Sequence, residues 1–325
     1  MTTSQHSVEV LLTPGDRAAA LAADAREGLT SQPKRLSPVW FYDDCGSMLF
    51  DEITRLEEYY LTRAERGLLT AHATEIAAVT GADTLVELGS GTSDKTRILL
   101  DALSAGGTLK RYAPLDVSEE TLRSAASDLA GDYSGLEVHG VVGDFHRHLG
   151  ALPAGRRRLI AFLGSTIGNL APEERARFLF DLDCTLSADD HILLGVDLVK
   201  DPARLIAAYD DPGGVTASFN RNALRVVNAE LGANFDPDRF DHLAVWNGDE
   251  HRIEMRLRSR SDQLVRVGGL DLDVAFAEGE EMRTEISTKF TSSGIAGELE
   301  RAGLVVEREW DAHGEFLLVL ARPYC

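Results

Sequence analysis

Apolar segments of strand length recur through the middle of the chain, separated by segments long enough to form helices. The segments 84–88, 111–116, 136–145, 159–164 and 191–197 are rich in Leu, Val, Ile and Ala. Apolar runs of this length predict strands that are covered on both faces. Because helix-length segments alternate with them, the pattern predicts a parallel sheet with helices on both sides.

The periodicity changes after residue 210. Residues 216–231 have the length and apolar spacing of a helix, and residues 253–258 and 270–276 alternate between apolar and polar side chains. A period of two is typical of strands with one buried face. Residues 304–310 and 316–321 then predict a terminal hairpin that returns to the first sheet. We therefore expect an α/β fold with an inserted α+β lobe.

A glycine-rich turn follows the first predicted strand, in the run Glu87-Leu88-Gly89-Ser90-Gly91, and a helix follows the turn. Glycines at 89 and 91 permit positive φ and let a ligand approach the main chain. A dinucleotide site would need G-x-G-x-x-G, with a helix N-terminus facing a pyrophosphate. Position 94 is Asp, which opposes a phosphate but tolerates a sulfonium ligand with an amino-acid tail. The turn therefore favours S-adenosylmethionine, and a plain tight turn is the alternative.

Two later strands also end in carboxylates. Asp116 ends the second predicted strand, where a carboxylate can accept both ribose hydroxyls of the cofactor. Asp144 and Phe145 end the third, where a carboxylate can accept from the adenine amino group and an aromatic ring can cover its face. For each carboxylate alone, a solvated strand end or a helix cap is the alternative. Together, the ends of three successive strands indicate one ligand.

Composition narrows the class of partner. With 33 Lys and Arg against 53 Asp and Glu, the net charge is −20, which disfavours nucleic acid and anionic membranes. We expect a small-molecule substrate and a monomeric protein. Cys45, Cys184 and Cys325 have neither paired nor metal-type spacing, so neither a disulfide framework nor a metal site is expected. Residues 1–10 lack a leader pattern and no apolar run approaches ~20 residues, so we expect a cytoplasmic protein.

Four stretches carry a more specific signal than the glycine turn. They are residues 41–47 (FYDDCGS), 57–63 (EEYYLTR), 164–170 (GSTIGNL) and 285–290 (EISTKF). With them, the chain resembles the L-histidine Nα-methyltransferase family of ergothioneine biosynthesis over nearly its whole length. The resemblance implies that three methyl groups pass from S-adenosylmethionine to the α-amino nitrogen of histidine, which gives hercynine.

The same resemblance implies an architecture. The fold is expected to be that of a class I adenosylmethionine-dependent methyltransferase, a Rossmann-like sheet with a terminal β-hairpin. The methyltransferase domain would comprise residues 62–199 and 290–325, and a substrate-recognition lobe would comprise residues 8–61 and 200–289.

Roles for particular residues are likewise implied by the resemblance. Cofactor-binding roles fall on Tyr42, Gly89, Lys95, Asp116, Asp144 and Phe145. The amino-acid end of the substrate would be held by Asn169 and Tyr209, and its imidazole by Tyr59, Glu285 and Ser287. Tyr42 and Asn169 are also the expected catalytic residues. The spacing of Glu285 and Ser287 agrees with a shared role, because residues two apart in a strand face the same side.

Simpler roles remain open for several of these side chains. Tyr59 and Tyr209 could be half-buried tyrosines with hydrated hydroxyls, and Lys95 an exposed helix residue. Glu285 follows an acidic run and could lie on a solvated edge, while Asn169 could cap a helix.

Two other functions are also weighed. One is a methyltransferase of the same fold that acts on another amino acid or amine, against which the pair Glu285 and Ser287 argues. The other is a non-enzymatic adenosylmethionine-binding regulator, against which the polar residues of the inserted lobe argue.

Overall fold

The computed structural model describes residues 6–91 and 93–324, which form two compact units. The sheet unit comprises the described residues of 1–12, 61–199 and 290–325, and the lobe unit comprises residues 13–60 and 200–289. Residues 8–12 and Leu61 were expected in the lobe but lie in the sheet unit. Residues 8–12 belong there because β1 (His6–Val10) pairs in parallel with β5 (Glu137–Val142).

The sheet unit is built on an 8-stranded sheet in the order β1-β5-β4-β3-β6-β7-β14-β13. Besides β1 and β5, its strands are β3 (Thr84–Leu88), β4 (Arg111–Asp116), β6 (Arg158–Phe162), β7 (His191–Asp197), β13 (Leu304–Asp311) and β14 (Phe316–Pro323). In this order, each strand from β1 across to β7 pairs in parallel with the next. Strands β14 and β13 add an antiparallel hairpin beside β7. This is the class I methyltransferase fold, extended by the parallel edge strand β1.

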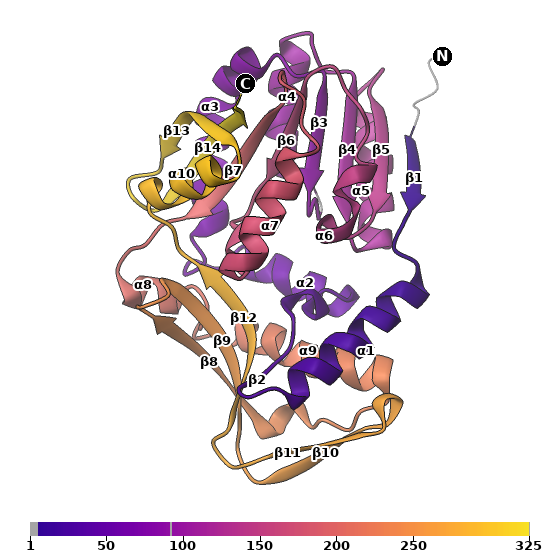
Figure 1. Ribbon diagram of the computed structural model, residues 1–325, viewed down its shortest axis with the longest axis vertical. Coiled ribbons are helices and arrows are strands. Elements are labelled where there is room, and N and C mark those ends of the chain that lie inside the picture. The colour runs from indigo at the N-terminus through magenta and orange to yellow at the C-terminus, as the bar shows by residue number, and fades with distance from the viewer. Residues whose placement is uncertain (1–5, 92, 325) are drawn as a thin grey trace. The chain divides into compact units, whose positions relative to one another are not determined.

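Helices cover both faces of this sheet (Figure 1). They are α3 (Leu61–Thr80), α4 (Thr96–Ala105), α5 (Glu119–Asp132), α6 (Phe145–His148), α7 (Pro172–Asp183) and α10 (Ser292–Arg301). Val86 and Leu88 of β3 share a buried core with Phe178 of α7 and Ile295 of α10. Every residue of β3 is buried, because the strand lies between two helical layers.

The order of strands places a switch point between β3 and β6. From β3 the chain proceeds to its neighbour β4 on one side, and from β6 it proceeds to β7 on the other. Ligands of open α/β sheets bind at the carboxyl ends of the strands beside such a point. The turns after β3, β4, β5 and β6 are therefore where a site in this unit is expected.

The lobe unit contains a 4-stranded sheet in the order β2-β12-β9-β8. Its strands are β2 (Lys34–Arg35), β8 (Phe240–Asn247), β9 (Arg252–Ser259) and β12 (Glu281–Thr288), and β10 (Gln263–Val267) pairs separately with β11 (Leu272–Phe276). The helices of the unit are α1 (Pro14–Thr30), α2 (Asp44–Ile53), α8 (Pro202–Ala207) and α9 (Val215–Leu231). Fully buried Asn220 of α9 donates to the carbonyl of Arg256 at 3.0 Å, so α9 packs on this sheet.

Several element boundaries differ from those predicted. The strand predicted over residues 136–145 ends at Val142 as β5, because Asp144 instead caps α6, where its carboxylate accepts from the His146 amide at 2.8 Å. Strand β8 was not predicted. Apart from Phe240 its residues are all of intermediate burial, so it shows no alternation of buried and exposed side chains.

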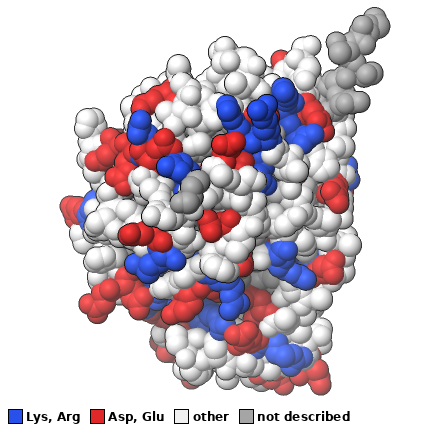
Figure 2. Space-filling model, turned by 45° about the horizontal axis from the view of Figure 1, so that its top comes forward, with Lys and Arg blue, Asp and Glu red and all other residues white. Residues whose placement is uncertain are grey.

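The surface agrees with a chain that carries both signs of charge. On the face shown in Figure 2, acidic and basic side chains are interspersed. Among the described residues, no helix combines the length and the apolar character needed to cross a membrane.

Candidate active site

The glycine turn after β3 borders open space. Gly89 and Gly91 have φ values of 70° and 49°, which glycine adopts readily. A Cβ atom built at either position would meet no atom within 4 Å. Residue 92 lies outside the described residues, and the main chain at Gly89 and Gly91 leaves room for a ligand. This observation fits an adenosylmethionine molecule held against the main chain.

Asp116, at the end of β4, braces that turn. One carboxylate oxygen accepts from the Gly91 amide and the other from the Ser118 amide, both at 2.9 Å. Burial raises the pKa of Asp116, and the backbone hydrogen bonds oppose that rise. Since each carboxylate oxygen has a second lone pair, the side chain can still accept from two further donors such as ribose hydroxyls.

Asp144 and Phe145 lie at the turn after β5. One Asp144 oxygen accepts from the His146 amide at 2.8 Å and so caps α6. The Phe145 ring packs against Phe162 and Phe178, with centroid separations of 5.1 and 5.6 Å. Asp144 is therefore a helix cap, and its carboxylate retains acceptor capacity for a ligand.

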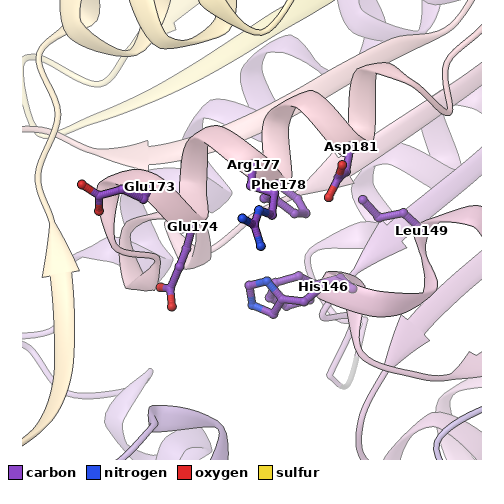
Figure 3. Close-up of a pocket in the computed structure, with 8 residues that line it drawn as sticks. His146, Leu149, Glu173, Glu174, Arg177, Phe178 and Asp181 are labelled. Carbon is purple, nitrogen blue, oxygen red and sulfur yellow. The ribbon is translucent and has the colours of Figure 1, made fainter. Parts of the chain in front are cut away.

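A pocket of about 290 Å³ opens beside Phe145, between α6 and α7. Figure 3 shows the His146 ring and the Arg177 guanidinium reaching toward the same opening. The lining residues are Phe145, His146, Leu149, Glu173, Glu174, Arg177, Phe178 and Asp181. All the polar lining residues are exposed, so this is a surface pocket beside Phe145 rather than an enclosed site.

A buried hydrogen-bond network lies at the base of the glycine turn. The Glu87 carboxylate accepts from the Thr96 hydroxyl and, at 2.5 Å, from the Tyr112 hydroxyl. Tyr112 is also 2.8 Å from the Ser93 hydroxyl, and Ser93 has a φ of 57°. Burial raises the pKa of Glu87 to about 7. The network holds in place the residues that connect the glycine turn to α4.

Lys95 lies at the N-terminus of α4, where it forms an ion pair with Glu65 of α3. Its side chain is 23% exposed, so it is not the freely exposed helix residue that was the simpler alternative. Glu65 is fully buried and also accepts from the Gly164 amide at 2.7 Å. Lys95 therefore lies close to both the turn after β3 and the turn after β6.

Asn169 ends a short 3-10 helix, η3 (Thr166–Asn169), just after β6. Two left-handed residues, Gly164 and Ser165, precede it with φ values of 75° and 59°. Asn169 does not cap α7, because Ala171 is the cap residue and the Glu174 carboxylate accepts from its amide at 3.0 Å. It is half-buried on the turn beside the switch point.

In the lobe unit, three tyrosines with implied roles belong to one aromatic cluster. Tyr42 packs against Phe50 and Phe219, each at 5.6 Å between ring centroids. Tyr59 lies 6.2 Å from Phe50 and 6.1 Å from Tyr209 by the same measure. The cluster joins residues from segments that lie far apart in the sequence.

The cluster continues into a polar triangle. Tyr209 and Ser287 are joined by a hydrogen bond of 2.8 Å between their hydroxyls, and the Lys289 ammonium donates to both at 2.8 Å. Lys289 is 1% exposed and Ser287 3%. Two residues assigned to opposite ends of the substrate thus contact each other directly.

A β-bulge sets the direction of Glu285 and Ser287. The register of β12 on β9 shifts between Arg283 and Glu285, because Thr284 is an extra residue. Before the shift, Arg283 lies opposite Arg256; after it, Glu285 lies opposite Met255 and Ser287 opposite Ile253. Met255 and Ile253 are buried, and directly opposed residues share a face. The bulge therefore turns Glu285 and Ser287 onto the buried face of the sheet.

Within each unit, the candidate residues gather in one region. The sheet unit brings Gly89, Lys95 and Asp116 around the glycine turn, with Asp144, Phe145 and Asn169 on the neighbouring turns. The lobe unit joins Tyr42, Tyr59, Tyr209 and Ser287 through ring contacts and hydrogen bonds, with Glu285 on the same strand face as Ser287. Sequence reasoning missed four residues in these groups: Phe50, Glu65, Phe219 and Lys289. For Lys289, the alternation with Glu285 and Ser287 was the available signal.

Known histidine methyltransferases match this chain over nearly its whole length. The model of a family described as "Histidine-specific methyltransferase, SAM-dependent" matches residues 21–323. The Histidine N-alpha-methyltransferase of Mycolicibacterium smegmatis is 56% identical over 95% of this chain and 97% of its own. That of Mycobacterium tuberculosis is 56% identical over 93% and 94%. Ergothioneine biosynthesis protein 1 of Neurospora crassa is 38% identical over 62% of this chain and 23% of its own. The chain therefore belongs to the S-adenosylmethionine-dependent, histidine-specific methyltransferase family.

Proposed function

We propose that the protein transfers methyl groups from S-adenosylmethionine to the α-amino nitrogen of L-histidine, with hercynine as the product and ergothioneine as the end of the pathway. The observation that carries this proposal is the 56% identity to a Histidine N-alpha-methyltransferase over 95% of the chain. No metal is required, because the sulfonium supplies an activated methyl group and the reaction is a direct displacement.

In this proposal the sheet unit holds the methyl donor. Gly89 and Gly91 would let its amino-acid portion lie against the main chain, and Lys95 would donate to its carboxylate. Asp116 would accept from the ribose hydroxyls and Asp144 from the adenine amino group, with Phe145 against the base. The open space at the glycines and the spare acceptor positions on both aspartates support this assignment.

The lobe unit would select the acceptor. Glu285 would accept from an imidazole N–H, and the Ser287 hydroxyl and Tyr59 would contact the same ring. Tyr209 and Asn169 would hold the amino-acid end. The bulge that turns Glu285 and Ser287 onto one buried face supports a shared planar ligand.

The chemistry asks for alignment more than for acid or base strength. The attacking amine must be neutral, and partial desolvation favours its neutral form. Asn169 and Tyr42 would orient this nitrogen so that it, the methyl group and the sulfur lie in line. Methylation of the nitrogen leaves the carboxylate and the imidazole of the acceptor unchanged, so both can be bound in the same way for all three transfers. We also propose that the protein is a monomer, which sedimentation equilibrium would test.

A panel of amino acids with methyl-labelled S-adenosylmethionine tests the function. We expect histidine to take up label far faster than any other amino acid, and mass spectrometry should find mono-, di- and trimethylated histidine. Label in another amino acid but not in histidine would refute the assignment of the acceptor. Binding of the cofactor without transfer to any acceptor would instead favour a regulatory protein.

A further inference from the structure

Glu65 is a fully buried carboxylate that no sequence argument selected. It lies in the second turn of α3, and its side chain is 0% exposed. A buried carboxylate is costly unless it is paired and hydrogen-bonded. Here both needs are met by groups from two different turns, the Lys95 ammonium and the Gly164 amide, the latter at 2.7 Å.

The surrounding backbone leaves space for this carboxylate. A Cβ atom on Gly195 of β7 would lie 2.0 Å from Glu65 Oε1, a distance that real Cβ atoms do not show. Glycine in the middle of a buried strand costs stability, and it often marks a close approach by another group. The group that approaches Gly195 is Glu65.

The two partners of Glu65 flank the switch point. Lys95 follows the glycine turn after β3, and Gly164 begins the turn after β6 that ends at Asn169. Strands β3 and β6 are neighbours in the sheet, and the chain leads from them to opposite sides, from β3 to β4 and from β6 to β7. Glu65 therefore bridges the two turns at the point where a ligand of this fold is expected.

We propose that Glu65 is a positioning residue that locks the Lys95 turn to the Asn169 turn and so couples cofactor binding to alignment of the acceptor. This inference rests on the proposed function for the roles of Lys95 and Asn169. An ammonium has three N–H donors, so Lys95 can hold Glu65 and still donate to the carboxylate of the cofactor. Without Glu65, Lys95 loses its fixed position, and the Gly164 amide loses its acceptor.

Two variants separate the two arms of the bridge. Glu65→Gln keeps an oxygen for the Gly164 amide but loses the charge that holds Lys95. We expect its affinity for S-adenosylmethionine, measured by calorimetry without histidine, to fall about 10-fold, with kcat at saturating cofactor changed less than about 3-fold. Glu65→Ala removes both contacts, and we expect a further loss of about 10-fold in kcat for histidine.

A double-mutant cycle with Lys95→Met tests whether Glu65 acts through Lys95. In that background, Glu65→Gln should change the affinity for the cofactor less than about 2-fold, because its partner is already absent. Equal effects of Glu65→Gln in the presence and absence of Lys95 would overturn the proposal.

The control is a buried ion pair of the same kind at the other end of the strands. Asp190, which is 0% exposed, accepts from Arg158 at 2.7 Å where β6 and β7 begin. Asp190→Asn should lower the melting temperature but leave the affinity for the cofactor within about 2-fold. If both variants lowered affinity in proportion to lost stability, Glu65 would have only a structural role.

Should Glu65→Gln fail to fold, Glu65→Asp retains the charge while its side chain is one methylene too short to reach both partners. Unchanged affinity and kcat in that variant would also contradict the proposal. Because the calorimetry uses no acceptor, it remains decisive for the Lys95 arm even if the protein methylates something other than histidine.

Discussion

Two pairs of carboxylates, one pair in each unit, differ in how their burial is compensated. In the sheet unit, burial raises the pKa of Glu87 and Asp116, which lie at strand ends around the glycine turn. In the lobe unit, burial alone would raise the pKa of Glu254 and Glu281, but hydrogen bonds from neighbouring arginines lower it. Glu254 and Glu281 are paired with arginines of the lobe sheet. Glu87 and Asp116 instead accept from neutral hydroxyl and amide groups, and buried carboxylates with raised pKa values are typical of sites that bind a ligand.

The first test of this contrast is the effect of Glu87 on how the free energy of unfolding depends on pH. The largest effect is expected here. Its pKa rises from 4.5 to about 7 on folding, so the folded protein binds more protons than the unfolded chain between these values. The contribution of Glu87 to the free energy of unfolding is complete below pH 4.5 and lost as the pH rises through about 7. The difference corresponds to about 3 kcal/mol. Glu87→Gln should remove this slope, measured by urea unfolding from pH 4.5 to 7.5. Parallel curves for the variant and the wild type would show that Glu87 is ionised throughout.

The second test concerns the turn after β6. Asn169→Ala should lower kcat for histidine at least about 100-fold, roughly 2.7 kcal/mol, because alignment of the acceptor nitrogen is lost. Affinity for S-adenosylmethionine should stay within about 2-fold. Steady-state kinetics and calorimetry separate the two quantities. If the variant lost cofactor affinity but turned over normally at saturating cofactor, Asn169 would belong with the cofactor residues instead.

The third test concerns Asp116. Asp116→Ala removes a carboxylate proposed to accept from the ribose and also frees the Gly91 amide that it holds. Loss of charge-assisted hydrogen bonds of about 1.5–3 kcal/mol predicts a loss of cofactor affinity of at least about 10-fold. Calorimetry with S-adenosylmethionine measures it, and Asp101→Ala, on an exposed face of α4, is a matched control. An unchanged dissociation constant would remove Asp116 from the site.

The smallest effect is expected on the lobe sheet. Arg283 lies directly between Arg35 of β2 and Arg256 of β9. Burial lowers its pKa, and the neighbouring arginines lower it further while Glu254 opposes them. Like charges in direct opposition destabilise a sheet, so Arg283→Gln should raise stability by roughly 0.5 kcal/mol. Thermal unfolding would check this. A clear loss of stability would mean that the arginine row supports the lobe.

The positions of the residues proposed to hold the cofactor were largely predictable, because the sequence signals for them are local. Glycines 89 and 91 need only their own backbone freedom, Asp116 ends a strand that the apolar pattern identifies, and Asp144 lies just after another. The buried partners behind them were not predictable. Glu65 looks like an ordinary polar residue of an amphipathic helix. Its burial depends on Gly195, which lies 130 residues later in the sequence.

The lobe depended more on resemblance. Alternation placed Glu285 and Ser287 on one face, but it could not say which face, because the extra residue Thr284 reverses the parity of the strand. The contacts of Tyr59 with Phe50 and Tyr209 likewise arise from long-range packing that no local pattern reveals. The two-residue spacing therefore put Glu285 and Ser287 on one face, and the bulge determined which face this is.

The most direct test of the account is acceptor selectivity after Glu285→Ala. The variant would leave the imidazole N–H without its acceptor, at a cost of roughly 1–3 kcal/mol. We predict that kcat/KM for histidine falls about 10- to 100-fold, while the slower use of amino acids that lack a ring N–H changes little. Relative kcat/KM across an amino-acid panel, for wild type and variant, provides the measurement. Equal proportional losses for every acceptor would contradict the account, because Glu285 would then support the lobe without selecting the ring.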